Sequence, residues 1–260
     1  MKNSENAIHR AAADGFPRAA EDYVRGRPDY PPEIVDWLRD QIGLHSGATV
    51  VDLGAGTGKF TPRLVETGAR VIAVEPIAEM LSKLAAAWPQ VEALAATAES
   101  LPLPDASVDA VVCAQAFHWF ATREALAEID RVLKPAGRLG LVWNMKDERV
   151  GWVAHLDQIM KQVEGDTPRY QSGAWRELLP FPGFGPLFEH HFPHGHIGTP
   201  EDVIIHRVRS TSFIAALAPE ERATIEDQVR ALIATAPELI GKDLVTFPYV
   251  TVAFSTVKVD

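Results

Sequence analysis

Glycines and acids at the ends of two short apolar runs are the residues best suited to chemistry. The first run carries Asp52 and is followed by Gly54, Gly56 and Gly58, and the second ends at Glu75. Glycines let the backbone approach a ligand closely, and the N-terminus of a following helix attracts an anion. An acid at the end of the next strand is placed to accept hydrogen bonds from ribose hydroxyls. These residues together predict a site for a nucleoside-bearing ligand.

The glycine spacing separates two classes of ligand. Dinucleotide-binding strands carry G-x-G-x-x-G, whereas residues 54–58 read G-x-G-x-G after an acid. Here the sequence resembles the class I S-adenosylmethionine-dependent methyltransferases, so S-adenosyl-L-methionine is the expected cofactor and S-adenosyl-L-homocysteine the product. The loop suits the methionine end of the cofactor, whose carboxylate the backbone N–H groups would bind. The expected cofactor residues of this region are Asp52, Gly54, Ala55, Gly56 and Gly58 at the methionine end, with Glu75 and Pro76 at the ribose.

Two further segments extend the predicted cofactor site. Ala98 and Glu99, followed by Ser-Leu-Pro, resemble the segment with which the family contacts adenine. Met80, in the helix after Glu75, would lie against the adenine, although plain core packing explains it equally well. Gln115 follows a third apolar run, at the carboxyl end of a strand where α/β sheets bind ligands.

His118 and Trp119 are the predicted acceptor side of the site. A His-Trp pair at this position is typical of type 11 methyltransferases that resemble trans-aconitate methyltransferase, which act on small molecules. For a hydroxyl or amine acceptor, His118 is the candidate general base; for a carboxylate it would only position the acceptor. The purely structural alternative is that His118 hydrogen-bonds a carbonyl group and Trp119 packs in the hydrophobic core. Asn144 and Arg209 complete the predicted substrate residues. Arg207 or Arg209 could hold an acidic group of the substrate, and an ordinary helix-surface arginine is the alternative for each.

The N-terminal stretch Tyr23–Pro31 resembles a segment that folds over the cofactor in the same group. The resemblance places Tyr23 near the sulfonium, where an aromatic face suits a cation, and Arg27 on a carboxylate. An ordinary surface helix is the alternative for both.

Composition excludes several other functions. Lys and Arg number 25 against 35 Asp and Glu, a net charge of −10, which argues against nucleic acid as partner or substrate. The single Cys113 lies in an apolar run and reads as a core thiol. His190, His194 and His196 would share one strand face, but Pro193 and Gly195 are expected to break that strand, and no metal site is predicted. No run of about 18 apolar residues exists, so a cytoplasmic protein without membrane contact is expected.

The elements that must position these residues alternate along the chain as in a doubly wound α/β fold. Strands are expected at 49–53, 71–74, 91–95, 110–114 and 139–143, with a helix capped by Thr122 that ends in a loop at Leu133–Gly137. Residues 150–185 read as an irregular covering segment. An antiparallel pair, 188–194 with 249–257, is expected to complete a mostly parallel seven-stranded sheet.

The predicted organisation is one methyltransferase domain over residues 1–260. Residues 1–31 would cover the cofactor, 32–145 bind it, 146–248 form a helical substrate cap with the sixth strand, and 249–260 form the last strand. The expected reaction is methyl transfer to a small molecule, with O-methylation of a hydroxyl or carboxylate favoured, by in-line displacement. A nicotinamide-dependent oxidoreductase and a non-catalytic S-adenosylmethionine-binding regulator remain alternatives. Oligomeric state is not predicted.

Overall fold

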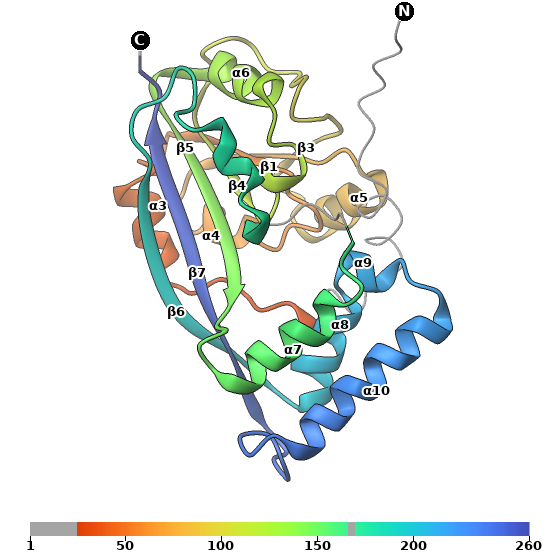
Figure 1. Ribbon diagram of the computed structural model, residues 1–260. Helices are drawn as coiled ribbons and strands as arrows, with labels where there is room; N and C mark the ends of the chain where they lie inside the picture. The colour runs from red at the N-terminus through yellow and green to blue at the C-terminus, as the bar shows by residue number, and fades with distance from the viewer. Residues whose placement is uncertain (1–24, 166–169, 260) are drawn as a thin grey trace, which may run out of the picture. The chain divides into compact units, whose positions relative to one another are not determined.

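The computed structural model describes residues 25–165 and 170–259. Within these residues a seven-stranded sheet has the order β3-β2-β1-β4-β5-β7-β6 (Figure 1). Strands β1 to β5 pair in parallel, and β7 is antiparallel, which confirms the predicted fold class. The strands are β1 (Thr49–Leu53), β2 (Arg70–Val74), β3 (Glu92–Leu94), β4 (Val108–Ala114), β5 (Leu133–Lys146), β6 (Phe188–Gly198) and β7 (Val245–Val257).

The helices connect the parallel strands and fill the segments between β5, β6 and β7. The α-helices are α3 (Ile34–Asp40), α4 (Thr61–Val65), α5 (Ala78–Ala87), α6 (Arg123–Val132), α7 (Gly151–Lys161), α8 (His206–Arg209), α9 (Ser212–Ala215) and α10 (Pro219–Thr235). Short 3₁₀ turns are η1 (Phe117–Trp119), η2 (Tyr170–Ser172) and η3 (Ala174–Leu178), and a π-helical turn, η4 (Glu201–Ile205), precedes α8.

The chain divides into two compact units. Among the described residues, the core unit contains 30–144, 170–192 and 251–259, and the helical unit contains 25–29, 145–165 and 193–250. Strands β5, β6 and β7 contribute residues to both units.

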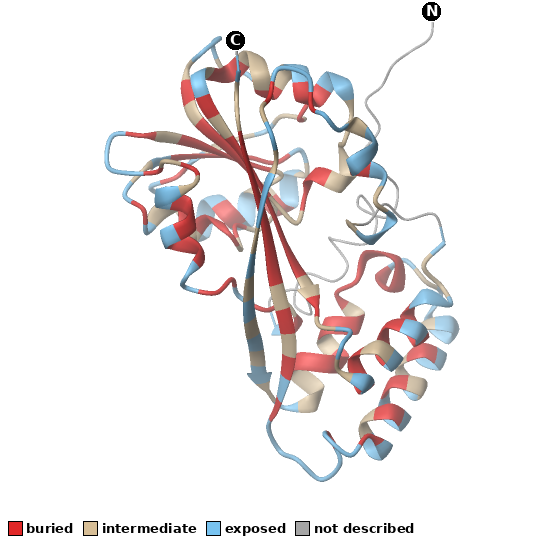
Figure 2. Ribbon diagram, turned by 60° about the vertical axis from the view of Figure 1, so that its left-hand side comes forward, coloured by how far each residue is buried: buried red, intermediate tan, exposed pale blue. Residues whose placement is uncertain are grey.

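The core unit is built on buried parallel strands, whose residues show as buried in Figure 2. Strands covered on both faces read as continuous apolar runs, which is why the sequence pattern located them. One cluster joins α3, α4 and α5 to alternate strand residues; its members include Trp37, Leu38, Leu64, Leu84, Val50, Ala73, Ala110, Val112 and Val142.

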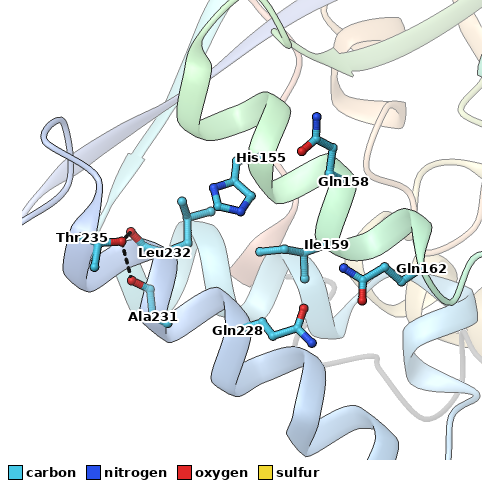
Figure 3. A pocket seen from close by; sticks show the side chains of 8 residues that line it. All are labelled: His155, Gln158, Ile159, Gln162, Gln228, Ala231, Leu232 and Thr235. Carbon is cyan, nitrogen blue, oxygen red and sulfur yellow. Dashed lines mark hydrogen bonds between the residues drawn. The ribbon is translucent and has the colours of Figure 1, made fainter.

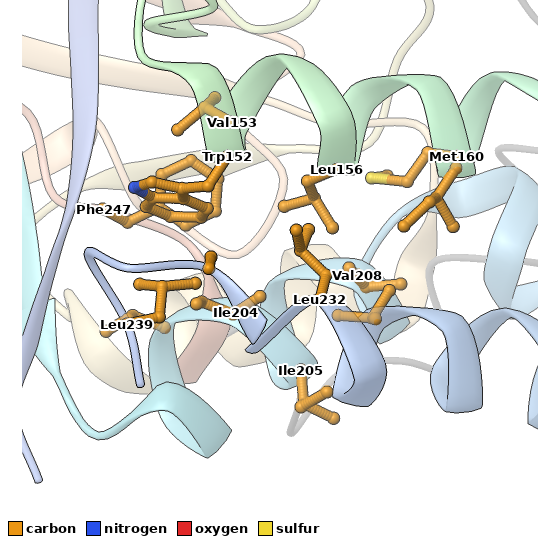
Figure 4. Close-up of a cluster of buried hydrophobic side chains, with 14 of the residues drawn as sticks. Trp152, Val153, Leu156, Met160, Ile204, Ile205, Val208, Leu232, Leu239 and Phe247 are labelled. Carbon is orange, nitrogen blue, oxygen red and sulfur yellow. The ribbon is translucent and has the colours of Figure 1, made fainter. Parts of the chain in front are cut away.

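The helical unit has its own apolar core, in which α7, η4, α8 and α10 pack with the first residues of β7 (Figure 4). Leu156, Ile204, Val208, Leu232 and Phe247 are among the buried members of this cluster. The Lys146 ammonium at the end of β5 forms a buried ion pair with Asp157 of α7, so the helix is tied to the strand that precedes it.

Helix α7 contradicts the prediction of an irregular segment at residues 150–185. Trp152, Val153, Leu156, Ile159 and Met160 are all buried, at the i, i+1, i+4, i+7 and i+8 spacing of one helix face. The aromatic residues and prolines further along the segment suggested irregular structure and obscured the helical spacing of these apolar residues. Residues 170–178 do form the short irregular turns η2 and η3.

Two predicted breaks in strands are also wrong. The expected loop at Leu133–Gly137 belongs to β5, whose pairing with β4 shifts register between Val108 and Ala110, and Ala136 takes a positive φ there. The strand therefore accommodates the irregularity as a bulge. Likewise β6 continues through Pro193 and Gly195. It is the edge strand of the sheet, where a proline without an N–H is tolerated.

Thr122 caps α6 as predicted, because its hydroxyl accepts a hydrogen bond from the Ala125 N–H at 3.1 Å. Thr122→Ala should lower the free energy of unfolding by about 1 kcal/mol, the usual contribution of such a cap. Thr122→Ser keeps the oxygen and should lose much less. Urea unfolding of both variants checks this, and equal losses would show that the threonine methyl group, not the cap, is responsible.

Candidate active site

The glycine loop after β1 is held by Glu75 at the end of β2. Leu53 and Val74 are register partners, so the two strands end side by side. The N–H groups of Gly54 and Ala55 donate to the Val74 carbonyl at 2.9 and 3.1 Å. The Gly56 N–H then donates to Glu75 Oε2 at 2.9 Å, while Oε1 accepts from the Ile77 N–H at 3.0 Å. One carboxylate therefore fixes both the loop and the start of the segment leading to α5.

The loop needs glycine for two separate reasons. Gly54, Gly56 and Gly58 all have positive φ, of 73°, 59° and 84°, a conformation that strains other residues. A Cβ on Gly54 would also lie 2.6 Å from the Ala116 Cβ, and one on Gly56 would lie 3.1 Å from the Met80 Cε. The predicted residue Met80 is thus buried against the loop.

Asp52 and Glu75 form a pair of buried acids beneath this loop. Burial raises the pKa of Asp52 to about 7, against a hydrogen bond from the Thr61 hydroxyl at 2.8 Å and with a further rise from the Glu75 charge. Burial also raises the pKa of Glu75, although the N–H groups of Ile77 and Gly56 oppose the shift. Asp52 Oδ1 has no hydrogen-bond partner among the described residues. A cation bound here would stabilise both ionised carboxylates.

Ala98 and Glu99 occupy a tight turn at the same edge of the sheet. The turn is closed by a bridge between Thr97 and Ser100 and follows β3, whose Leu94 pairs with Val74 of β2. The Leu101 N–H donates to Glu128 of α6 at 2.7 Å, which anchors the turn. Ala98 is buried, whereas Glu99 is partly exposed and Pro76 is exposed.

Gln115 joins the ends of β4 and β5. It has a positive φ of 56°, and its side-chain Nε2 donates to the Asn144 carbonyl at 3.0 Å. The Asn144 side-chain oxygen accepts from the Thr251 hydroxyl at 2.5 Å. The two predicted residues are therefore in contact, and the carbonyl and the side-chain oxygen of Asn144 both bind partners within the core unit.

His118 lies on η1 and is bound by Trp143, a residue whose role the sequence analysis missed. The Trp143 Nε1 donates to His118 Nδ1 at 3.1 Å. Because an indole N–H can only donate, Nδ1 must be the accepting nitrogen, and the neutral ring carries its proton on Nε2. The Trp119 ring lies beside the imidazole, with centroids 5.1 Å apart.

Trp143 is itself fixed by aromatic packing. It is fully buried and stacks on Trp175 at 5.0 Å, with Tyr170 at 4.9 Å and Phe254 at 6.0 Å. The only signal for this residue in the sequence was its place at the end of an apolar run, which indicates burial and not a partner.

The remaining predicted residues lie elsewhere. Tyr23 lies outside the described residues. Arg27 belongs to the helical unit, where it donates to the Ser210 carbonyl at 3.0 Å and to its hydroxyl at 3.2 Å. Arg209 is in the same unit, on α8, and forms an ion pair with Glu226 at 2.6 Å.

Other possible sites hold none of these residues. A groove of about 360 Å³ lies between α7 and α10, and its polar lining is mostly glutamine (Figure 3). Its lining residues are His155, Gln158, Ile159, Gln162, Gln228, Ala231, Leu232 and Thr235. In the described part of the chain no group of three His, Cys, Asp or Glu could hold a metal ion. No helix there is long and apolar enough to cross a membrane.

Comparisons with known proteins identify the family to which the chain belongs. A family model described as a methyltransferase domain matches residues 51–141. An uncharacterized methyltransferase of Mycobacterium tuberculosis is 47% identical over 237 residues, which are 91% of this chain and 93% of the relative. The trans-aconitate 2-methyltransferase of an Azoarcus species is 29% identical over 230 residues, 81% of this chain and 88% of that protein.

A solved structure shows the same fold. It is that of a protein from Anaeromyxobacter dehalogenans proposed to be a type II methyltransferase, with a TM-score of 0.61 at 23% identity, covering 89% of this chain and 97% of the other. The chain belongs to the class I S-adenosylmethionine-dependent methyltransferases. It is a distant homologue of trans-aconitate methyltransferase, and its methyl donor is S-adenosylmethionine. The nicotinamide-dependent and non-catalytic alternatives are therefore set aside.

The raised pKa of Asp52 predicts a pH-dependent stability. The ordinary value is 3.8 and the folded value is about 7, so the stability that the neutral carboxyl confers at acid pH is lost as the pH rises through 7. Asp52→Asn keeps an acceptor for Thr61 and cannot ionise. It should raise the melting temperature more at pH 8 than at pH 5.

Calorimetric melting at both pH values checks this prediction, and an equal effect at the two would contradict it. Asp109→Asn is the matched control with the opposite sign. The Lys134 ammonium and the Thr49 N–H hold the pKa of Asp109 below its ordinary value in spite of partial burial. That variant should lose stability at pH 8.

Glu75→Ala should weaken binding of S-adenosylhomocysteine at least tenfold. The substitution removes the acceptor of the Gly56 and Ile77 N–H groups, so the loop loses its fixed geometry as well as the acid. Titration calorimetry measures the affinity, and circular dichroism checks the fold. Glu66→Ala removes an exposed acid that pairs with Arg63 and should bind normally. Unchanged affinity in Glu75→Ala would remove this residue from the site.

Proposed function

We propose that this methyltransferase methylates a carboxylate oxygen of a small organic acid by in-line displacement. The observation that carries the proposal is the hydrogen bond from Trp143 Nε1 to His118 Nδ1. It concerns the acceptor, which the family resemblance left open between a hydroxyl and a carboxylate.

The cofactor residues are assigned from the chemistry of the donor set. S-adenosylmethionine supplies a methyl group on a positively charged sulfur, together with an ammonium and a carboxylate. The free Oδ1 of Asp52 and the two buried acids suit the positive groups. The loop carries no side chain at Gly54, Gly56 and Gly58, so its backbone can approach the methionine end closely. Glu75 would then bind the ribose hydroxyls, and the adenine would contact Met80, Ala98 and Glu99.

The tautomer of His118 favours a carboxylate acceptor. A general base must offer a lone pair, but Nδ1 already accepts from Trp143 and Nε2 carries the proton. The ring is therefore arranged to donate a hydrogen bond through Nε2–H. A hydroxyl acceptor must lose a proton on methylation, whereas a carboxylate arrives ionised at neutral pH.

The reaction balances without proton transfer. The acceptor oxygen forms a bond to the methyl carbon as the sulfur–methyl bond breaks, and the electron pair of that bond stays on sulfur. Both starting charges disappear, so alignment and exclusion of water supply the main catalytic effect. His118 would orient one carboxylate oxygen, with the Trp119 ring beside it.

Likeness to the Azoarcus enzyme supports the same class of acceptor. That relative is named a trans-aconitate 2-methyltransferase, and trans-aconitate is a small organic acid. The site residues Asn144 and Arg209 remain proposals on the substrate side, and Tyr23 and Arg27 on the cofactor side.

The nature of the product tests the proposal. With radiolabelled S-adenosylmethionine and a panel of small organic acids that includes trans-aconitate, we expect label to appear in a methyl ester. An ester releases volatile methanol in alkali, whereas a methyl ether does not. Label that survives alkali would contradict the assignment to a carboxylate.

Variants at His118 distinguish a hydrogen-bond donor at this position from a general base. The amide of Gln places an N–H donor near the position of Nε2 and has no basic nitrogen. His118→Gln should therefore keep kcat within a few-fold of the wild type, and His118→Ala should lose at least tenfold, with the affinity for S-adenosylhomocysteine unchanged in both. Trp143→Phe keeps the aromatic packing but not the N–H, and should also lower kcat. Equal loss in His118→Gln and His118→Ala would indicate a general base.

A further inference from the structure

Arg207 of α8 is a buried cation in the helical unit without an acidic partner. Only 7% of its surface is exposed. Its Nη1 donates to the Thr211 hydroxyl at 2.9 Å, and no carboxylate of the described residues lies within ion-pair distance. The Nε has no hydrogen-bond partner in the described chain. With Nη2 it forms the edge of the guanidinium that binds a carboxylate through two parallel hydrogen bonds.

Two other arginines of the same unit have acidic partners. Arg209, two residues along α8, pairs with Glu226 at 2.6 Å, and Arg230 of α10 pairs with Glu201 at 2.8 Å. Both are more exposed than Arg207. A buried charge is costly unless it is paired and hydrogen-bonded. Arg207 is thus the most buried of these three arginines, and it has no acidic partner among the described residues.

Tyr249 of β7 adds a second unsatisfied donor beside this guanidinium. Its side chain is 1% exposed, and its hydroxyl proton has no acceptor within the described residues. The ring is held between Phe247, at 4.8 Å, and His194, at 5.7 Å. Burial raises the pKa of Tyr249, while the positive charges of Arg207 and Arg27 and hydrogen bonding from the Arg207 guanidinium to the phenol oxygen oppose the rise. The phenol thus stays protonated and able to donate.

Arg27 brings a second positive charge to the same place. Its guanidinium is fixed on Ser210, at the end of α8, and acts on the Tyr249 hydroxyl together with Arg207. The preceding Gly26 allows this approach, because a Cβ there would lie 2.3 Å from the Arg207 backbone nitrogen. Arg27 therefore adds a second positive charge in the neighbourhood of Arg207 and Tyr249.

We propose that Arg207 and Tyr249 form a binding site for a carboxylate group of a small molecule, with Arg27 adding positive charge. The ligand oxygens would accept from the guanidinium edge and from the phenol, which satisfies the buried donors and neutralises the buried charge. The identification of the bound carboxylate as part of the methyl acceptor rests on the proposed function. The proposal that Arg207 and Tyr249 bind a carboxylate does not depend on that function.

Binding of citrate to the whole protein, without S-adenosylmethionine, tests the site. Titration calorimetry at pH 7.5 should show citrate binding to the wild type. Arg207→Met and Tyr249→Phe should each weaken it at least tenfold while leaving the affinity for S-adenosylhomocysteine unchanged. Arg230→Met, which removes an exposed arginine of the same unit, should bind citrate as the wild type does.

Several outcomes would overturn the proposal. The proposal is wrong if the wild type does not bind citrate, or if Arg207→Met binds citrate as tightly as the wild type. It is also wrong if inorganic phosphate displaces citrate at equal concentration, which would indicate a phosphate site. Tyr249→Phe keeps the ring packing, so a folded variant is available if Arg207→Met is unstable. Since no methyl is transferred in this assay, citrate binding without methylation of organic acids would leave this site intact and refute the proposed function alone.

Discussion

The geometry of the predicted cofactor site depends on the hydrogen bonds that the Glu75 carboxylate accepts. It ends β2, yet it fixes the loop that follows β1 through the Gly56 N–H. That contact exists only because the two strands are parallel and end in register at Leu53 and Val74. A carboxylate that accepts two backbone N–H groups is held in one orientation. The loop, the acid and the entry to α5 are thereby positioned as one piece, which preorganises the site before any ligand arrives.

The same contact sets the electrostatics of the site. Glu75 is kept close to Asp52, and its charge makes ionisation of Asp52 less favourable where water is excluded. Asp52 Oδ1 has no hydrogen-bond partner among the described residues. A positively charged group bound beside it would make ionisation of both carboxylates more favourable.

Much of this could be predicted from the sequence because it depends on short-range patterns. Continuous apolar runs located β1, β2 and β4, and glycines and acids at their ends located the loop and Glu75. Helix α7 was missed although its period is regular, since aromatic residues nearby suggested irregular structure. The continuity of β6 through Pro193 depended on its place at the sheet edge, which no local pattern shows.

The role of Trp143 could not be found in that way. Its contact with His118 depends on the pairing of β4 with β5, in which Ala114 lies opposite Val142. Only that register brings the indole, one residue later on β5, to the turn that carries His118. A local pattern marks Trp143 as buried, but the partner of its N–H, His118, lies 25 residues earlier in the sequence.

The two arginines of α8 are a second case in which the sequence could not show which side chain has a partner. Arg207 and Arg209 have the same side chain, and the sequence alone offers either one to an acidic ligand. Residues two apart on a helix are about 200° apart around its axis, so one faces the core when the other faces solvent. Arg209 takes the outer position and finds Glu226, while Arg207 is buried next to Tyr249. The exposed arginine is already neutralised by the protein, and the buried one is the arginine that a ligand would neutralise.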